Sequence, residues 1–287
     1  MTETPPLSAL GIRKKFRSKL SCFNADVRSA RKNICFWQKA NITKNIYLFV
    51  DENEYVTLPD DLKYFAISRP SSFSGTHANM QQWHLEFLRN RHPRTVVGLI
   101  DGDLPINSKG VSRSSKHFPV LGEVPPVRTE NYVDPYIAGV HIRRAVMEWT
   151  NSGILLGGFP IDPATFKQDR GYCAYPPIFD WVVRDGYLRN FFIIFPTFQG
   201  CFGPSIGDGL GVLEDAHFSL SGGHENIGLY QGLCLRFSAA KGSSKRNTSV
   251  AHEAEKRKLA ELLGRSFDEI RNYLSSRYIK KILNKTA

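Results

Sequence analysis

The feature that most constrains the fold is a change of pattern at Asn45, where short apolar runs begin. NIYLFV (45–50), TVVGLI (95–100) and GILLGGF (153–159) are the clearest of them. Short apolar runs bounded by turn-forming residues are typical of strands, whereas the helical period of about 3.6 residues is confined to separate stretches. The pattern predicts an α+β protein: a β-rich central body with a few helices, a basic N-terminal arm and a C-terminal helical hairpin.

Several stretches of this central body have assignments of their own. DENE (51–54), between NIYLFV and YVTL (55–58), has the charge and the turn formers of a hairpin connection. HANMQQWHLEFLRNRH (77–92) predicts a helix that ends before Pro93. AGVHIRRAVMEW (138–149) reads as a further strand, although a helix also fits it.

The later part of the body contains a long loop and a predicted hairpin. Residues 104–136 are rich in Pro, Ser, Gly and charge, which is typical of a surface loop or lid. In IFDWVVRDGYLRNFFIIF (178–195) we predict a hairpin that turns at Asp185-Gly186 into a strand of residues 191–195. A winged helix, with a recognition helix that closes on Gly186, is the alternative.

Length and composition indicate the class of protein. The chain has 287 residues, 41% hydrophobic and 23% charged, which is typical of a soluble globule with one large domain or two smaller ones. No apolar run approaches the roughly 18 to 20 residues that cross a bilayer, and the first ten residues lack the order of a secretory signal. We therefore predict an intracellular protein, in the cytoplasm or with the nucleoid or nucleus, and no membrane partner.

The cysteine and histidine residues form no recognisable metal-binding or catalytic motif. The five cysteines never form a CxxC pair, so we interpret them as reduced thiols packed like small apolar side chains. A zinc site that combines one cysteine with a distant histidine is the alternative. The eight histidines form neither HExxH nor HxH and are interpreted as structural or surface residues.

Positive charge is concentrated at the two ends of the chain. The net charge is +11, yet residues 11–32 hold eight basic residues against one acid, and residues 241–287 hold twelve against five. The charge pattern divides the chain into a basic N-terminal arm (1–32), an α+β body (33–240) and a basic helical hairpin (241–287). Lysine and arginine residues that neutralise phosphates release condensed counterions, so basic ends are suited to nucleic acid. Improved solubility is the simpler alternative.

The basic N-terminal arm has a possible helical pattern. Ile12, Phe16, Leu20 and Phe23 recur at spacings of three and four residues, so they lie on one face of a predicted amphipathic helix. Its basic residues coat the other faces, as in an arm that contacts RNA or DNA. Binding to an anionic membrane surface is the alternative.

The C-terminal segment has the signals of two helices joined by a tight turn. A helix is predicted from Val250 to Leu263, Gly264 provides the left-handed residue that ends it, and Ser266 with Glu269 forms a capping box for the next helix. The arrangement resembles the helix-turn-helix pattern, which implies that the second helix reads DNA. Generic phosphate contact and plain packing of an αα-hairpin remain alternatives, because Asp268 and Glu269 at the reading end repel phosphate.

A pair of acidic residues follows the apolar run TVVGLI. Asp101 and Asp103 are one residue apart at the end of a predicted strand, a spacing that places both carboxylates on one side for a divalent ion. VVGLIDGDLP resembles the local arrangement of nucleotidyl transferases and DXD glycosyltransferases. A two-metal reaction needs a third carboxylate, for which Asp134, Glu148 and Asp208 are candidates. A polar turn is the alternative. We predict no cofactor, with Mg²⁺ at this pair as the alternative.

The function expected from these patterns is nucleic-acid binding. We predict that the basic ends grip the phosphate backbone of DNA or RNA, with possible protein partners in a larger nucleoprotein assembly. The alternatives are a metal-dependent nuclease or nucleotidyl-transfer enzyme that uses Asp101 and Asp103, and a coat-like or scaffold protein. The side chains predicted to bind nucleic acid are Arg13, Lys14, Lys15, Arg17, Lys19, Arg31, Lys32, Arg265, Arg271, Asn272, Lys280 and Lys281.

Overall fold

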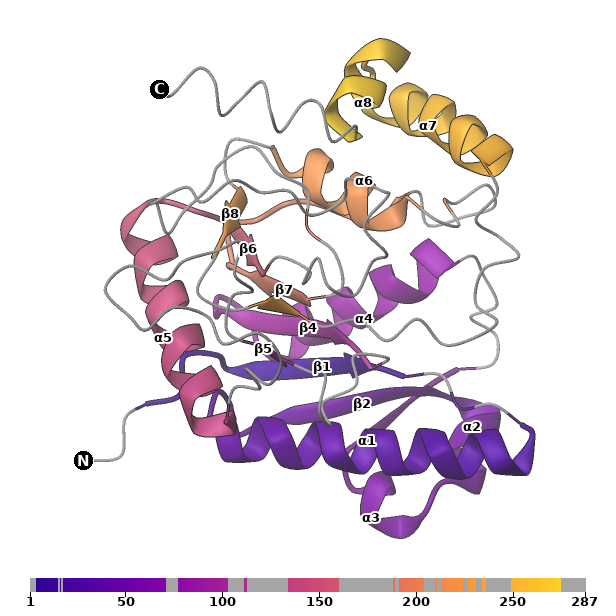
Figure 1. Cartoon of the computed structure of the whole chain (residues 1–287), viewed down its shortest axis with the longest axis vertical. Helices are drawn as coiled ribbons and strands as arrows, with labels where there is room; N and C mark the ends of the chain where they lie inside the picture. Colours follow the sequence, from indigo (N-terminus) through magenta and orange to yellow (C-terminus); the bar gives the residue numbers. More distant parts are fainter. Residues whose placement is uncertain are drawn as a thin grey trace.

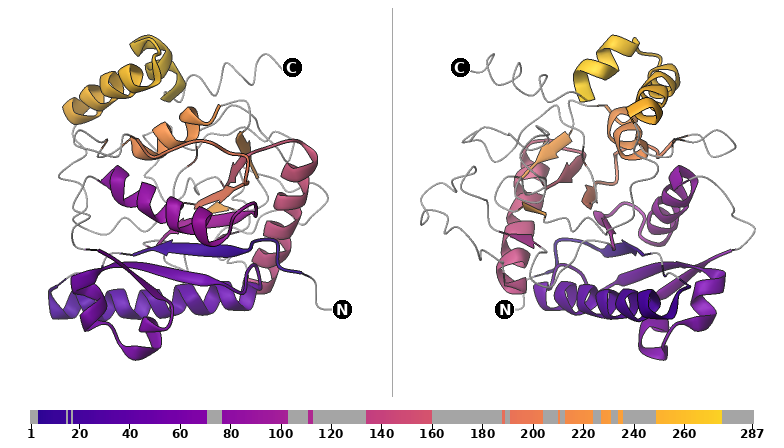
Figure 2. Two further views of the ribbon diagram at one scale, coloured as in Figure 1. Left: turned by 180° about the vertical axis from the view of Figure 1, so that it is seen from behind. Right: turned by 45° about the vertical axis from the view of Figure 1, so that its right-hand side comes forward.

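The computed structural model of the chain shows a seven-stranded mixed sheet with helices on both faces (Figure 1, Figure 2). This arrangement confirms the predicted α+β class. The structure describes residues 4–14, 16, 18–70, 77–102, 111–112, 134–159, 188, 191–203, 210, 213–223, 227–230, 234–235 and 249–274.

The elements alternate between strand and helix through the first half of the chain. In order they are β1 (Ala9–Arg13), α1 (Leu20–Ala40), β2 (Ile46–Asp51), α2 (Glu52–Thr57), α3 (Asp60–Lys63), β3 (Ala66–Arg69), α4 (His77–Arg91), β4 (Val97–Asp101), β5 (Val111–Ser112), α5 (Pro135–Asn151), β6 (Leu156–Gly158), β7 (Phe191–Ile194), α6 (Glu214–Ser221), β8 (Ile227–Leu229), β9 (Cys234–Leu235), α7 (Ser249–Leu263) and α8 (Phe267–Leu274). A separate two-stranded sheet pairs β5 with β9.

The order of strands in the main sheet is β3-β2-β1-β4-β7-β6-β8. Strands β1 to β4 are parallel, and β7 is antiparallel to both of its neighbours. Parallel neighbours require crossover connections, which α1, the α2–α3 segment and α4 supply. The chain moves from β1 outward to β3 and then returns to place β4 on the other side of β1, so the order reverses between β1 and β4.

Two apolar clusters fill the space above and below the sheet. On one face, α1 and α5 pack through residues such as Ile34, Trp37 and Trp149. On the other face, α4 and α6 pack through Leu85, Phe218 and their neighbours. Of the helices in the described residues, none has both the length and the apolar character needed to cross a membrane.

The predicted N-terminal arm is different in the structure. Residues 9–13 form β1, a fully buried strand between β2 and β4, and α1 begins only at Leu20. The predicted helical face is therefore wrong, because Ile12 lies in the strand. A central parallel strand is buried on both faces and reads as a short continuous apolar run. The run SALGI (8–12) is such a signal. The basic residues that follow it led to the prediction of an amphipathic helix instead.

Two further assignments are corrected by local helix signals. The predicted hairpin at DENE is wrong: Asp51 and Glu54 form a capping box that begins helix α2. The stretch 138–149, read first as a strand, lies in α5, which begins with Pro135 and the capping side chain of Asp134. The strand predicted near residue 191 is confirmed as β7, whereas the turn at Asp185-Gly186 lies outside the described residues.

The C-terminal helical hairpin forms as predicted. Helices α7 and α8 are joined at Gly264, whose φ of +61° is left-handed. The Ser266 N–H donates to Glu269 (2.8 Å), and this contact, the largest cause, lowers the pKa of Glu269. The hairpin packs on α6 through Leu259, Ala260 and other apolar residues. It lies at the opposite end of the molecule from α1 (Figure 1).

Contact between α1 and α5 depends on a glycine. A Cβ atom at Gly139 would clash with the carbonyl oxygen of Ala40 at the end of α1. Helix propensity alone favours alanine over glycine by about 1 kcal/mol. We nevertheless expect Gly139→Ala to lower the free energy of unfolding by about 1–3 kcal/mol, because the backbone must move apart. Urea unfolding measures the change.

The matched control for this change is Val140→Ala on the same helix. Val140 is 43% exposed, so its replacement should alter stability by less than about 0.5 kcal/mol. A Gly139→Ala protein as stable as the wild type would show that α1 and α5 are not in close contact.

Candidate functional site

The four parallel strands β1 to β4 end at the same edge of the sheet, and each ends in a charged residue. These residues are Arg13, Asp51, Arg69 and Asp101, and we call them the carboxyl-edge row. Arg13 is in register with Asp101, and Asp51 with Arg69.

All four side chains of the row lie on the face of the sheet that α4 and α6 cover. Residues two apart on a strand project to the same side, and Phe49 and Leu99, two before Asp51 and Asp101, belong to the cluster on that face. Across β3-β2-β1-β4 the charges alternate as positive, negative, positive, negative. The sequence thus places a polar, charge-balanced row where the hydrophobic core ends.

The row includes the point where the strand order reverses, between β1 and β4. In open sheets of this kind, ligands bind outside the carboxyl ends of the strands at that point. The two strand ends are in close contact, because the Gly102 N–H donates to the Arg13 carbonyl oxygen (2.6 Å). A Cβ atom at Gly102 would lie 2.6 Å from that oxygen, so glycine is needed there.

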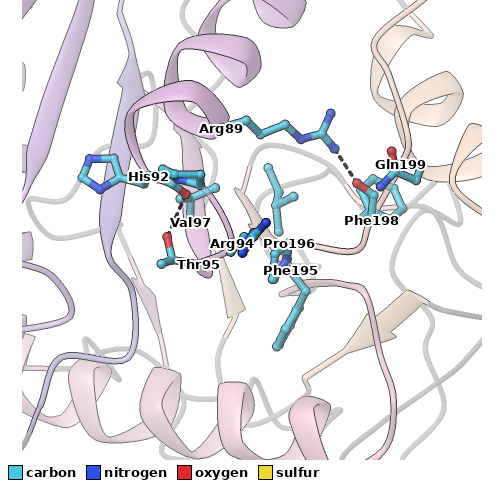
Figure 3. A pocket seen from close by; sticks show the side chains of 11 residues that line it. Arg89, His92, Arg94, Thr95, Val97, Phe195, Pro196, Phe198 and Gln199 are labelled. Atoms are coloured by element: carbon cyan, nitrogen blue, oxygen red, sulfur yellow. Dashed lines mark hydrogen bonds between the residues drawn. The ribbon is translucent and has the colours of Figure 1, made fainter.

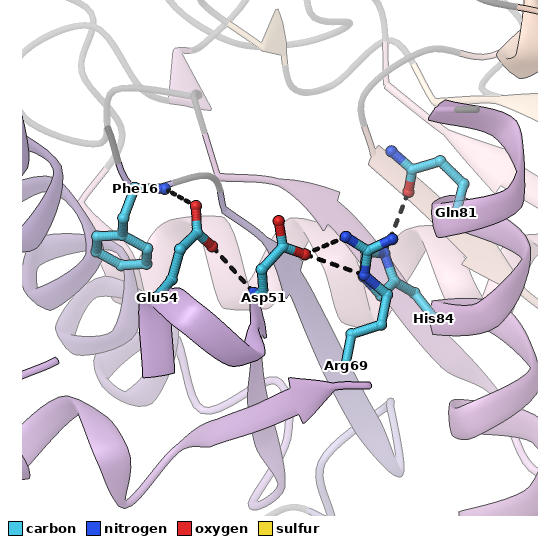
Figure 4. Close-up of polar contacts among 6 residues, drawn as sticks. All are labelled: Phe16, Asp51, Glu54, Arg69, Gln81 and His84. Atoms are coloured by element: carbon cyan, nitrogen blue, oxygen red, sulfur yellow. Dashed lines mark hydrogen bonds and ion pairs between the residues drawn. The ribbon is translucent and has the colours of Figure 1, made fainter. Parts of the chain in front are cut away.

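The β2 and β3 half of the row is held by hydrogen bonds (Figure 4). The Arg69 guanidinium donates to Asp51 through Nε (3.0 Å) and also through Nη2. Glu54 accepts from the Asp51 N–H (3.0 Å) and from the Phe16 N–H (2.9 Å). Glu54 therefore ties the chain that leaves β1 to the chain that leaves β2.

Helix α4 contributes two polar side chains beside Arg69. Gln81 points toward the guanidinium in Figure 4, and His84 lies next to it. Both are buried. The His84 ring stacks on Phe49 at 4.4 Å between centroids, which fixes its orientation. The cluster of positioned polar side chains thus extends from the strand ends to the first turns of α4.

Arg13 is the buried cation at the centre of the site. It is only 6% exposed, and its guanidinium lies 5.5 Å from the centre of the Phe192 ring. The Asp215 carboxylate at the start of α6 is 3.8 Å from Nη1, too far for a hydrogen bond. Within the described part of the chain, Nε and Nη1 of Arg13 make no hydrogen bond. Buried charged donors without an acceptor are costly, which makes this position unusual.

Lys14 follows Arg13 and points to the opposite face of the sheet. Its ammonium group is 3.6 Å from the Asp26 carboxylate of α1, and both side chains are buried. Asn33 of α1 donates to the Gly102 carbonyl oxygen (3.2 Å). Lys14 is therefore part of the packing between α1 and the sheet, not a side chain on the surface.

The acidic pair predicted to hold a metal ion is only partly described. Asp101 ends β4 as expected, whereas Asp103 and Asp208 lie outside the described residues. Asp134 caps α5, and Glu148 pairs with Arg144 on that helix. Helix α5 covers the other face of the sheet, so neither supplies the third carboxylate. Among the residues that the structure describes, no group of three or more potential ligands is suited to a metal ion.

The other predicted basic residues of the N-terminal segment lie within α1, just before it, or outside the described residues. Arg31 is exposed and donates two hydrogen bonds to Asp61 (2.7 and 2.8 Å). The Arg31 side chain lowers the pKa of Asp61, mainly through these hydrogen bonds. Lys19 precedes α1 and Lys32 lies within it, both exposed. Lys15 and Arg17 lie outside the described residues.

The described part of the helical hairpin is electrically balanced. Residues 249–274 contain five basic and five acidic residues. Arg271 and Asn272 are exposed and Arg265 is partly exposed, whereas Lys280 and Lys281 lie outside the described residues. The predicted DNA-reading helix thus carries no excess of positive charge in this part.

The structure brings together two residues that the sequence had singled out for different reasons, Arg13 for contact with nucleic acid and Asp101 for binding a metal ion. Asp51 and Arg69 were missed. Asp51 directly follows the apolar run NIYLFV, which is a signal that the sequence contains, whereas Ser68 separates Arg69 from the apolar residues of β3. Asp215 had no such signal, because only the packing of α6 on the sheet brings it near Arg13.

Comparison with known proteins adds no assignment. No protein-family model matches the sequence, and no curated protein shows significant similarity to it. The interpretation of the site therefore depends on its geometry and chemistry.

Proposed function

We propose that the chain binds a phosphate-bearing ligand, a nucleotide that is free or part of a nucleic acid, at the carboxyl edge beside Arg13. The observation that carries the proposal is the buried Arg13 guanidinium at the β1/β4 reversal, with two donors that make no hydrogen bond to the described residues. A phosphate oxygen is the acceptor best suited to a planar guanidinium.

The rest of the row suits the sugar of such a ligand. Asp51 ends β2, and its side chain is 44% exposed although it pairs with Arg69. A carboxylate at the end of the second strand is positioned for ribose hydroxyl groups in sheets with this order of strands. Arg13 ends β1 and Lys14 directly follows it, where such folds often have a glycine-rich loop, so the phosphate contact is assigned to a side chain, not to backbone amides.

Arg13→Gln tests this proposal directly. We expect binding of ATP, measured by calorimetry at low salt, to weaken about 10-fold to 100-fold, because a hydrogen bond to a charged group contributes about 1.5–3 kcal/mol. Lys39→Gln in the exposed last turn of α1 is the matched control and should leave affinity unchanged. Thermal melting checks that both variants are folded. Equal ATP affinity of Arg13→Gln and the wild type would contradict the proposal.

A second function, phosphate contact through the C-terminal segments, is supported by one observation. Residues 241–248 and 275–287, on either side of the balanced hairpin, contain seven basic residues and no acidic one. Repeating the titration with a single-stranded oligonucleotide separates the two functions. Binding that falls steeply with salt but does not depend on Arg13 would assign the contact to these segments.

A further inference from the structure

A cavity of about 230 Å³ lies at the end of the sheet opposite to the carboxyl-edge row (Figure 3). It is situated where β4 begins at Val97 and β7 ends at Ile194, two residues that are paired in register. The chain that joins α4 to β4 and the chain that follows β7 form its walls, and we call it the amino-edge pocket. Val97 and Asp101 are the two ends of β4, about 13 Å apart at the usual rise of a strand, so the pocket is separate from the carboxyl-edge row.

Much of the lining of the amino-edge pocket is apolar. Val97 and Ile194 form its floor, while Phe195, which is 7% exposed, and the exposed Pro196 offer apolar surface to a ligand. Small-molecule sites are typically apolar clefts in which a few polar groups fix the orientation of the ligand. Because drug-sized ligands need about 300 Å³ or more, the pocket is suited to a smaller molecule.

The wall that follows β7 is fixed from two sides. Arg89 of α4 donates through Nη2 to the carbonyl oxygens of Phe198 (2.6 Å) and Gly200 (3.4 Å), and Figure 3 shows the first of these bonds. From α6, His217 Nδ1 lies 2.8 Å from the Cys201 carbonyl oxygen. The pocket is therefore formed before a ligand binds, which lowers the entropy lost on binding.

Two arginine residues, Arg89 and Arg94, are the permanently charged side chains that line the pocket. Arg89 uses only Nη2 in its bonds to the loop, so Nε and Nη1 remain as donors. Arg94 is exposed and forms no ion pair with the residues that the structure describes. His92 directs its ring away from the pocket (Figure 3), toward the Tyr47 hydroxyl group (2.9 Å). No acidic residue of the described chain lines the pocket, so its charge is positive and unbalanced.

The backbone of Arg94 has an unusual conformation. Its φ is +58°, in the left-handed region that favours glycine. Thr95 Oγ1 donates to the His92 carbonyl oxygen (2.9 Å) and so closes the turn in which Arg94 lies. A glycine would relieve the strain but would remove the guanidinium from the pocket. Strained residues of this kind cluster at ligand sites, where the side chain has a role that offsets the strain.

We propose that the amino-edge pocket binds a small organic monocarboxylate, with its carboxylate at Arg94 and its apolar part against Phe195 and Pro196. A guanidinium pairs with a planar carboxylate through two parallel hydrogen bonds. A phosphate presents more oxygen atoms, and the apolar lining offers no donors to them. The neutral side chains beside the arginines, Thr95 and Gln199, donate to backbone carbonyl oxygens instead (2.9 and 3.4 Å). This site does not depend on the ligand proposed for the carboxyl edge.

A titration of the full chain with benzoate, followed by ligand-detected NMR, measures this binding. Benzoate combines a carboxylate with a compact apolar ring, and we expect a Kd on the order of 1 mM for a probe of this size. Benzyl alcohol, which has the ring without the charge, should bind at least about 10-fold more weakly. Inorganic phosphate at the same concentration should not displace benzoate. Equal binding of benzyl alcohol, displacement by phosphate, or no binding of benzoate at about tenfold higher concentration would overturn the proposal.

Arg94→Gln tests the position of the carboxylate. We expect the affinity for benzoate to fall about 10-fold or more, because a hydrogen bond to a charged group is lost. Arg91→Gln is the matched control: it removes the same charge from the end of α4, at a side chain outside the lining of the pocket, and should leave the affinity unchanged. Thermal melting checks that both variants are folded. An equal loss in both variants would overturn the proposal, because it would show a general effect of charge.

Arg13→Gln separates this pocket from the carboxyl edge. Arg13 ends β1 in register with Asp101, at the other end of the strands, so its replacement should leave benzoate binding unchanged. Loss of benzoate binding in Arg13→Gln but not in Arg94→Gln would assign the anion to the carboxyl edge and overturn the proposal.

Discussion

Trp149→Ala is expected to lower the free energy of unfolding by about 3–5 kcal/mol, the range for removing a large aromatic side chain from a packed core. Trp149 is fully buried on α5. Gly157 of β6 and Gly228 of β8 are paired in register, and a Cβ atom at either would clash with the indole ring. The two glycines thus form a slot that the indole ring fills. An alanine at position 149 would leave that slot empty.

A milder replacement at the same position tests this explanation. Trp149→Phe keeps an aromatic ring in the slot and removes the indole N–H, which makes no hydrogen bond to the described residues. We therefore expect Trp149→Phe to cost less than about 2 kcal/mol. Tyr64→Ala, at a side chain that is 86% exposed, should change stability by less than about 0.5 kcal/mol. If Trp149→Ala and Tyr64→Ala lowered the free energy of unfolding by the same amount in urea, the packing of the indole ring against the two glycines would be contradicted.

Lys14→Met is expected to destabilise the protein by about 3–5 kcal/mol, because it leaves the Asp26 carboxylate buried without its ammonium partner. The two groups are 3.6 Å apart, and their side chains are 4% and 6% exposed. Guanidinium chloride or urea unfolding at neutral pH gives the size of the loss.

The double replacement Lys14→Met with Asp26→Leu shows whether the charge pair itself is the cause. Replacing both members of a buried pair by apolar side chains is often neutral or stabilising, so most of the stability should return. Arg31→Met is the control, because Arg31 and Asp61 form an exposed pair whose loss should cost at most about 1 kcal/mol. If Lys14 were instead an exposed surface cation, Lys14→Met would lower the free energy of unfolding only slightly, and adding Asp26→Leu would restore no stability.

These stability changes bear on the function expected from the sequence. Lys14 was predicted to contact phosphate, yet its charge is committed to Asp26 inside the protein. Arg13 is also buried, but its guanidinium lies against the Phe192 ring, and its Nε and Nη1 donors make no hydrogen bond to the described residues. The same basic run thus contains one structural cation and one that is proposed to bind the ligand.

The sequence alone determined those elements whose signals are local. Gly264 and the capping box of Ser266 and Glu269 specify the helical hairpin within a few residues, and the structure has both. The runs that became β2, β4 and β7 were recognisable as strands for the same reason. Each signal lies within the element that it specifies or within a few residues of it, so no distant contact is needed to read it.

Only the tertiary structure decided where charged side chains meet. The run before Arg13 became the central strand because β2 and β4 pair with it from residues 46 and 97 onward. The carboxyl-edge row, the pairing of Lys14 with Asp26 and the approach of His217 to Cys201 all join residues from separate helices and strands. Contacts of this kind depend on strand order and on which face of the sheet a helix covers, and neither is encoded in a local pattern of residues.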